Sequence, residues 1–207
     1  MHAKRFRAIL LAAALVGWSG IVGPRLPPRI QPLVHAVLAA CLVASVRAPL
    51  GLRPPRLWAG VRVGLTVAAP VLAGVAASTA STPVRSAMSD RALPAGALHW
   101  LLVRIPFGTV WSEEAAYRAA LGTVAGAAFG PTGGRLLQSA AFGLSHIADA
   151  RSAGEPVLGT IVVTGVAGWL FALVLARSGS LAAPMLAHLA VNEAGAVAAI
   201  AVQHRKG

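Results

Sequence analysis

The chain has 207 residues, of which 57% are hydrophobic and 12% are charged, and its formal net charge is +12. A soluble domain carries about twice this charged fraction, and apolar runs recur along the whole sequence, which excludes a soluble domain with one membrane anchor. A strongly basic chain can be a nucleic-acid-binding protein. Here the 18 Lys and Arg residues are scattered singly between apolar runs, a pattern typical of loops that face anionic lipid headgroups. We therefore expect a lipid bilayer, and no nucleic acid, as the partner of this chain.

Taken in chain order, the apolar runs predict an all-α, polytopic bundle of about eight transmembrane helices, because they lack the alternation of membrane strands. Proline and glycine residues separate the runs, as at Gly23-Pro24, Pro54-Pro55 and Gly133-Gly134. The predicted spans are residues 8–23, 32–46, 57–80, 93–109, 111–129, 136–149, 156–176 and 181–202. Several are shorter than the about 20 residues that cross a bilayer core. These helices are therefore longer than predicted, re-entrant, or buried within the bundle.

The basic residues between the spans predict that both termini lie in the cytoplasm, since cytoplasmic loops are enriched in Lys and Arg. The inside set has ten members: Lys4, Arg5, Arg7, Arg47, Arg53, Arg56, Arg62, Arg151, Arg205 and Lys206. The outside set has six: Arg25, Arg29, Arg85, Arg91, Arg135 and Arg177. A re-entrant segment at 93–109 would reverse the second half of this topology. The Arg- and Ala-rich composition is typical of a bacterial chain, so the expected location is the bacterial plasma (inner) membrane.

Ionisable side chains inside the spans are the first indication of function. Charged and titratable groups are costly in hydrocarbon, so those that occur there are candidates for a functional site. Three of the six acidic residues, Glu113, Glu114 and Glu193, fall within predicted spans, and so do His146 and His188.

The segment Trp111–Leu121 reads W-S-E-E-A-A-Y-R-A-A-L. Ser112 is expected to cap a helix that begins there, with acids in its first turn. Glu114 and Arg118 stand four residues apart on one helical face and can form an ion pair, whereas Glu113 points elsewhere. The alternative interpretation is that the two acids lie at the interface and stabilise a helix start.

Two later pairs have the same four-residue spacing. Phe142 and His146 share one helical face, and Asp149 could orient the His146 imidazole. His188 and Asn192 share a face of the last span, where two donors held side by side suit a developing oxyanion. The alternatives are a packing histidine for the first pair and a polar helix–helix clamp for the second.

Together these residues can form a hydrolytic site if their helices converge. Glu113 could take the proton of a water that His146 positions, while His188 and Asn192 hold the oxygen of the tetrahedral intermediate. This mechanism requires no cofactor. A zinc site is the other possibility, since Glu113, His146 and His188 could supply the about three protein ligands of catalytic zinc, although the sequence has no H-E-x-x-H.

The chain resembles the CPBP (CAAX protease, or Abi) family of intramembrane proteases, which includes the type II CAAX prenyl endopeptidases. The family motifs E-E-x-x-x-R, F-x-x-x-H and H-x-x-x-N occur in order as Glu113–Arg118, Phe142–His146 and His188–Asn192. The resemblance covers about residues 111–202 of the sequence. One departure is Ala119, where many members have glycine.

This resemblance implies a bundle whose site lies below the cytoplasmic surface. Glu113 and His146 would activate the water, and His188 and Asn192 would form the oxyanion hole. Glu114, Arg118 and Phe142 would support the site. The organisation expected is one membrane domain, with N-terminal helices in 1–92 and a catalytic core in 93–207.

The leading hypothesis is therefore an intramembrane endopeptidase that acts on a peptide or membrane-protein substrate. The alternative is a non-catalytic membrane immunity or scaffolding protein that keeps the polar cluster for packing. A proton-coupled transporter ranks third, because the polar groups are confined to one cluster instead of lining several helices.

Overall fold

The computed structural model describes residues 1–205, and these residues form helices connected by short loops. The elements are α1 (His2–Gly17), η1 (Trp18–Val22), η2 (Gly23–Arg25), α2 (Gln31–Val46), α3 (Arg56–Ser78), α4 (Thr82–Asp90), α5 (Ala97–His99), η3 (Trp100–Trp111), η4 (Glu114–Leu121), α6 (Gly122–Ser145), α7 (Ile147–Ala153), α8 (Val157–Ser178) and α9 (Ala182–His204). Of the short elements, η1, η3 and η4 are π-helical and η2 is a 3₁₀ turn. The prediction of an all-α chain is confirmed for the described residues.

Four helical segments are long and apolar enough to cross a membrane: His2–Arg25, Arg56–Ser78, Val157–Ser178 and Ala182–His204. The chain is accordingly an integral membrane protein. The larger count of about eight spans remains a prediction.

The predicted break between spans 93–109 and 111–129 is wrong. Helical structure continues from α5 through η3 and η4 into α6, and its main kink comes at Gly130, where φ is 75° and Pro131 follows. Ser112 does not act as an N-cap, because its hydroxyl donates to the carbonyl oxygens of Gly108 and Thr109 within the same helix. Such bonds to preceding carbonyls satisfy a hydroxyl without ending a helix.

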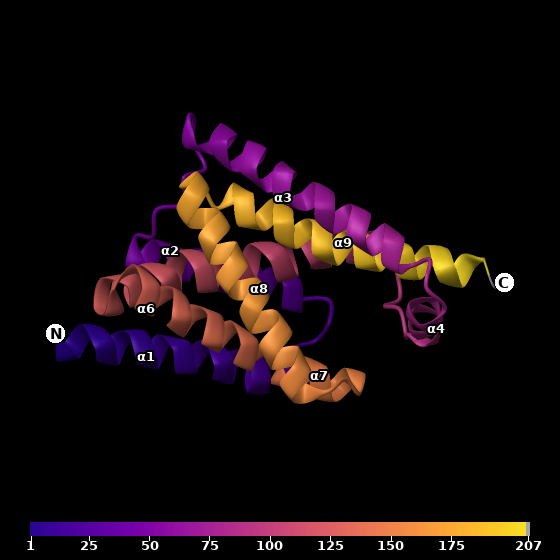
Figure 1. The fold of residues 1–207 in the computed structure, drawn as a ribbon. Helices are drawn as coiled ribbons and strands as arrows, with labels where there is room; N and C mark the ends of the chain where they lie inside the picture. The colour runs from indigo at the N-terminus through magenta and orange to yellow at the C-terminus, as the bar shows by residue number, and fades with distance from the viewer. Residues whose placement is uncertain (206–207) are drawn as a thin grey trace.

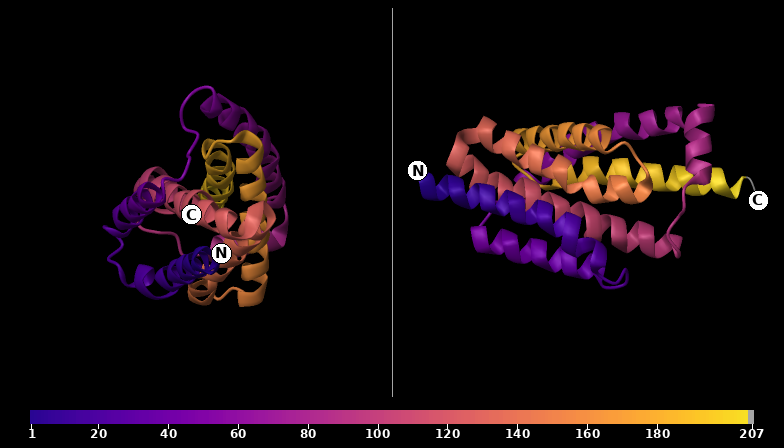
Figure 2. Two further views of the ribbon diagram at one scale, coloured as in Figure 1. Left: turned by 90° about the vertical axis from the view of Figure 1, so that its left-hand side faces the viewer. Right: turned by 90° about the horizontal axis from the view of Figure 1, so that it is seen from below.

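The long helices pack into an elongated bundle. In Figures 1 and 2, α3 runs alongside α9, while α6 lies between α1 and α8. α1 begins at one end of the long axis and α9 reaches the opposite end (Figures 1 and 2). The motif-bearing η4 segment is enclosed by α1, α2, α6 and α8.

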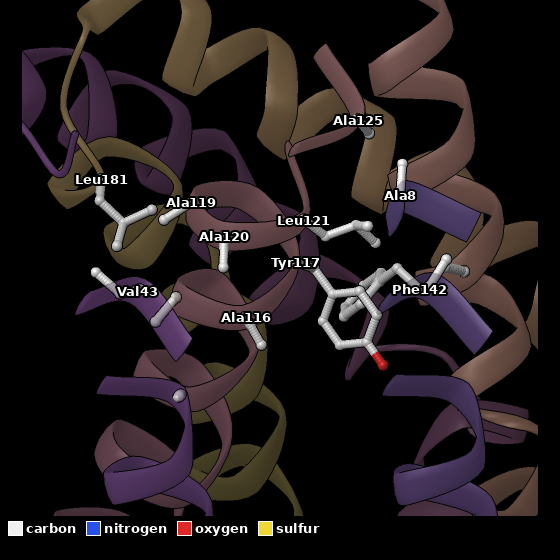
Figure 3. Close-up of a cluster of buried hydrophobic side chains, with 14 residues drawn as sticks. Ala8, Val43, Ala116, Tyr117, Ala119, Ala120, Leu121, Ala125, Phe142 and Leu181 are labelled. Atoms are coloured by element: carbon white, nitrogen blue, oxygen red, sulfur yellow. The ribbon is translucent and has the colours of Figure 1, made fainter. Parts of the chain in front are cut away.

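Small side chains surround η4 and allow this close packing. Figure 3 shows the cluster, in which Ala8, Val43, Ala116, Ala120 and Ala125 come from α1, α2, η4 and α6. Small residues let membrane helices approach one another closely. The resulting van der Waals contacts drive the association, because the hydrophobic effect does not act between helices in lipid. The alanines of η4 therefore place its polar residues in the centre of the bundle.

The contact of α3 with Ser180, just before α9, supplies a stability prediction. A Cβ atom on Gly60 would lie 2.5 Å from Ser180 Oγ, whereas a Cβ on Gly74, in the same helix, meets nothing within 4 Å. Gly60→Ala is therefore expected to destabilise the protein by about 1–3 kcal/mol through overpacking. Gly74→Ala, the matched control, should be neutral or slightly stabilising. Thermal inactivation midpoints in detergent measure both, and equal midpoints would contradict the packing described.

Candidate active site

The first motif forms a buried ion pair in η4. Arg118 Nε lies 3.2 Å from Glu114 Oε2, and both side chains are completely buried. The four-residue spacing brings the two groups together, as the sequence predicts. Burial removes the water around both charges, which costs free energy. Arg118 and Glu114 are stable here only because each is held close to the opposite charge of the other.

His188 joins this pair from α9. Its Nδ1 lies 2.8 Å from Glu114 Oε1, a hydrogen-bonding distance, and its Nε2 lies 3.8 Å from Glu113 Oε2. The structure therefore brings together both glutamates of the first motif and the histidine of the third. Glu114 was predicted as an ion-pair partner of Arg118 and as a supporting residue of the site. Its contact with His188, 74 residues further along the chain, has no local sequence signal.

Two phenylalanines enclose the charged groups. The Arg118 guanidinium lies 3.8 Å from the centre of the Phe142 ring and 5.2 Å from that of Phe171. Phe171 also stacks on the His188 imidazole, with ring centres 5.1 Å apart. Cation–π contacts of this kind stabilise a desolvated cation. Phe171, in α8, was missed by the sequence analysis because nothing marks it among the apolar residues of that helix.

His146 also packs against Phe142. Its ring contacts Phe142 edge-on at 4.7 Å, whereas the Phe142 and His188 rings are 6.2 Å apart. His146 Nδ1 is 2.7 Å from the carbonyl oxygen of Phe142, so the ring is held by its own helix and Nε2 is left for another partner. Phe142, a supporting residue in the prediction, thus packs against both histidines.

Asn192 occupies the next turn of α9. Its Nδ2 donates to the carbonyl oxygen of His188 at 3.2 Å. The amide is therefore adjacent to the imidazole along the helix, with one of its hydrogens directed at the backbone.

A cavity of about 530 Å³ opens beside Glu113. Leu11, Leu15, Leu38 and Leu42, from α1 and α2, give it apolar walls. Its polar lining comes from several elements and comprises Ser19, Gln31, His35, Ser112, Glu113, Tyr117, Asp149 and Ser152. Glu113, whose side chain is 27% exposed, is the motif acid at this wall, whereas Glu114 lies fully buried behind it.

The geometry can be tested against the predicted zinc site. No three His, Cys, Asp or Glu side chains within residues 1–205 form a group that could hold a metal ion. Of the three predicted ligands, Glu113 and His188 approach each other, with Oε2 and Nε2 3.8 Å apart, whereas His146 Nδ1 lies against the carbonyl oxygen of Phe142. The predicted zinc site therefore stays a prediction, and the chemistry proposed below uses no metal.

The comparisons with known proteins agree with the motifs. Residues 95–194 match the family model described as "Type II CAAX prenyl endopeptidase Rce1-like". No curated protein and no solved structure matches the chain. The matched region includes all three motifs and ends just after Asn192, whereas α1 to α4 lie outside it.

Proposed function

Because residues 95–194 belong to the CPBP family of CAAX-type proteases, we propose that the chain is an intramembrane endopeptidase that uses Glu113 to activate water. The observation that supports this most strongly is the pairing of Glu113 Oε2 with His188 Nε2, 3.8 Å apart, beside a cavity. This separation is too long for a direct hydrogen bond. Glu113 lines the cavity, whereas His188 does not, and the proposal places one water molecule between the two side chains.

In the proposed reaction, Glu113 removes a proton from this water as its oxygen attacks the scissile carbonyl carbon. A tetrahedral intermediate forms, and the proton then passes from Glu113 to the leaving nitrogen as the C–N bond breaks. The products are a new carboxyl terminus and a new amino terminus. No covalent enzyme intermediate is needed.

His188 is the proposed donor to the oxyanion, with Asn192 beside it. Glu114 accepts a hydrogen bond from His188 Nδ1 and so orients the ring toward Glu113. In this role His188 donates from Nε2 to the oxyanion and from Nδ1 to Glu114, so it carries a proton on each nitrogen. Asn192 reaches the same oxyanion if its amide rotates away from the His188 carbonyl. His146 remains the proposed positioning group for the water.

The substrate proposed is a peptide or membrane-protein segment that enters the cavity from the bilayer. The apolar walls contributed by α1 and α2 suit aliphatic side chains or a lipid group attached to the peptide. The proposed location is the bacterial plasma (inner) membrane.

The orientation of the termini can be tested separately. The positions of α1 and α9 at opposite ends of the bundle support termini on opposite faces of the membrane, in contrast to the predicted pair of cytoplasmic termini. His2→Cys and His204→Cys, each in a background where Cys41 is replaced by Ser, should react with a membrane-impermeant maleimide from opposite sides. Labelling of both from the cytoplasmic side would favour the topology predicted from loop charges.

A non-catalytic packing role is the second candidate. It is favoured by the burial of Glu114 and Arg118, which satisfy each other's charge without any substrate. In that case, Glu113 at the cavity wall would take no part in a reaction.

One experiment distinguishes the two candidates. The purified chain is reconstituted into liposomes with internally quenched peptides that end in a prenylated Cys-aliphatic-aliphatic-X sequence, and with the unprenylated series. An endopeptidase produces a rise in fluorescence that is absent from empty liposomes and from those holding Glu113→Gln. Intact peptides in every sample would contradict the proposed function.

A further inference from the structure

A second cavity, of about 610 Å³, lies where two membrane spans end, and it shares no lining residue with the cavity beside Glu113. α3 and α9 run in the same direction, since Gly60 near the start of α3 lies close to Ser180 just before α9, while residues at the far ends of both helices line this second cavity. Helix α4 lies beside these ends (Figure 1). Because the ends of membrane spans lie at the level of the lipid headgroups, the second cavity faces charged groups at the membrane surface.

The lining of the second cavity is basic and rich in hydroxyl groups. Its polar side chains come from the turn after α3, from α4 and from the residue after α9, and they are Thr79, Thr82, Arg85, Ser86, Ser89 and Arg205. Among residues 1–205, no Asp or Glu lines it, and Asp90, which follows Ser89, is not part of the lining. The ion pairs formed in this part of the chain all belong to the active-site cluster, so neither arginine has a carboxylate partner there. Two arginines without an acid favour a bound anion.

The Ser89 hydroxyl is a buried polar group without a partner. Its oxygen is shielded from solvent and forms no hydrogen bond with any of the described residues. The hydroxyls of Ser78, Thr79 and Ser81, at the same end of the bundle, each donate to a backbone carbonyl oxygen three residues earlier, which is a common way to satisfy a hydroxyl in or near a helix. A buried hydroxyl that lacks a partner costs free energy. A ligand that accepts a hydrogen bond from Ser89 would remove this cost.

The helices hold these groups in position before any ligand binds. Arg85 and Ser89 stand four residues apart, on one face of α4. Gln203 Nε2 donates to the carbonyl oxygens of Met88 and Arg91, at 2.9 and 2.8 Å, and so ties the end of α4 to the last turn of α9. A tetrahedral oxyanion accepts several hydrogen bonds at once, and bonds from a guanidinium are the strong, charge-assisted kind. The chemistry of the lining therefore suits a phosphate group.

We propose that the second cavity binds a phosphate group, carried by a lipid headgroup or free in water. Arg85 and Arg205 contribute the positive charge, and Ser89 donates a hydrogen bond to a phosphate oxygen. Basic pockets between membrane helices are a known setting for binding phosphorylated headgroups. Because the site lies apart from Glu113, its occupancy does not depend on the proposed peptidase activity.

The test titrates three ligands into the purified full chain in an uncharged detergent, with binding measured by isothermal titration calorimetry. The ligands are dioctanoyl phosphatidylglycerol, dioctanoyl phosphatidylcholine and inorganic phosphate. Binding of phosphatidylglycerol about fivefold more tightly than phosphatidylcholine, whose cationic choline opposes the arginines, identifies a headgroup site. Binding of inorganic phosphate without this lipid preference identifies a phosphate taken from water. In both cases the affinity should fall as NaCl is added.

Substitutions assign the binding to this cavity. Arg85→Gln and Arg205→Gln should each weaken binding about fivefold, since each removes one cationic contact. Arg91→Gln is the matched control, because Arg91 is an exposed arginine directly after α4 that does not line the cavity. Ser89→Ala should weaken binding about three- to tenfold, yet it should raise the thermal midpoint of the ligand-free chain, because it removes a buried hydroxyl that has no partner.

The results that would overturn the proposal are equally specific. It fails if phosphatidylglycerol binds no more tightly than phosphatidylcholine and inorganic phosphate does not bind. It also fails if the bound ligand has the same affinity for Arg85→Gln, Arg205→Gln and the Arg91→Gln control. Full affinity in Ser89→Ala would overturn the hydrogen bond assigned to Ser89. Thermal midpoints measured without ligand establish that each variant is folded.

Discussion

Glu113→Gln is expected to reduce peptide cleavage by about 10²- to 10⁴-fold, the range that a positioned general base contributes. The substitution keeps the shape of the side chain but removes the basic oxygen that faces His188 Nε2 at 3.8 Å. Because Glu113 is partly exposed and lies outside the buried pair, the variant should fold normally. Initial rates with a quenched peptide and a thermal midpoint measure the two properties.

The control for this prediction is Glu193→Gln, which neutralises an acid of α9 that we place outside the site. It should cleave at the unsubstituted rate. A rate for Glu113→Gln equal to that of the control would show that Glu113 is not the general base. A loss of rate together with a large fall in midpoint would instead indicate a structural role for Glu113.

The second large effect is expected at the buried ion pair. Arg118→Met should lower stability by about 3–5 kcal/mol, since it leaves a buried carboxylate without its counter-ion. The two aromatic contacts of the guanidinium, to Phe142 and Phe171, are lost as well. Denaturation in mixed detergent measures the change.

Arg62→Met, at an exposed position of α3, is the matched control and should change stability little. The double variant Glu114→Leu with Arg118→Met should recover part of the loss, because it removes both buried charges. If Arg118→Met is as stable as the control, the ion pair does not hold η4 in place.

The parts of the site predicted from sequence are those governed by local helix geometry. The Glu114–Arg118 pair and the Phe142–His146 contact each join residues four positions apart, so helix periodicity brings them together without any knowledge of the fold. The family resemblance, which was stated for about residues 111–202, is confirmed by the match of residues 95–194 to the family model.

The contacts between distant segments could not be predicted from spacing. The hydrogen bond from His188 to Glu114 and the stacking of Phe171 depend on how α8 and α9 pack around η4. Asn192 was expected beside an oxyanion but donates to the carbonyl oxygen four residues before it. A local backbone acceptor always competes for such a side chain.

Helix boundaries were the least predictable feature of the fold. Hydropathy suggested a break near Gly108 to Ser112, but π-helical turns continue across it. A π-helical turn adds a residue without interrupting the helix, so composition does not reveal it, and such turns are frequent at functional sites. The short helix α4 was likewise absent from the predicted spans, since it is too polar to register as an apolar run.

The most direct test of water activation by Glu113 is cleavage of a membrane-embedded peptide in water enriched in ¹⁸O, with products analysed by mass spectrometry. We expect the unsubstituted chain in liposomes to release a fragment with one ¹⁸O atom at its new carboxyl terminus, and Glu113→Gln to leave the peptide intact. Labelled product at equal rates from both chains, or no product from either, would contradict hydrolysis by this glutamate.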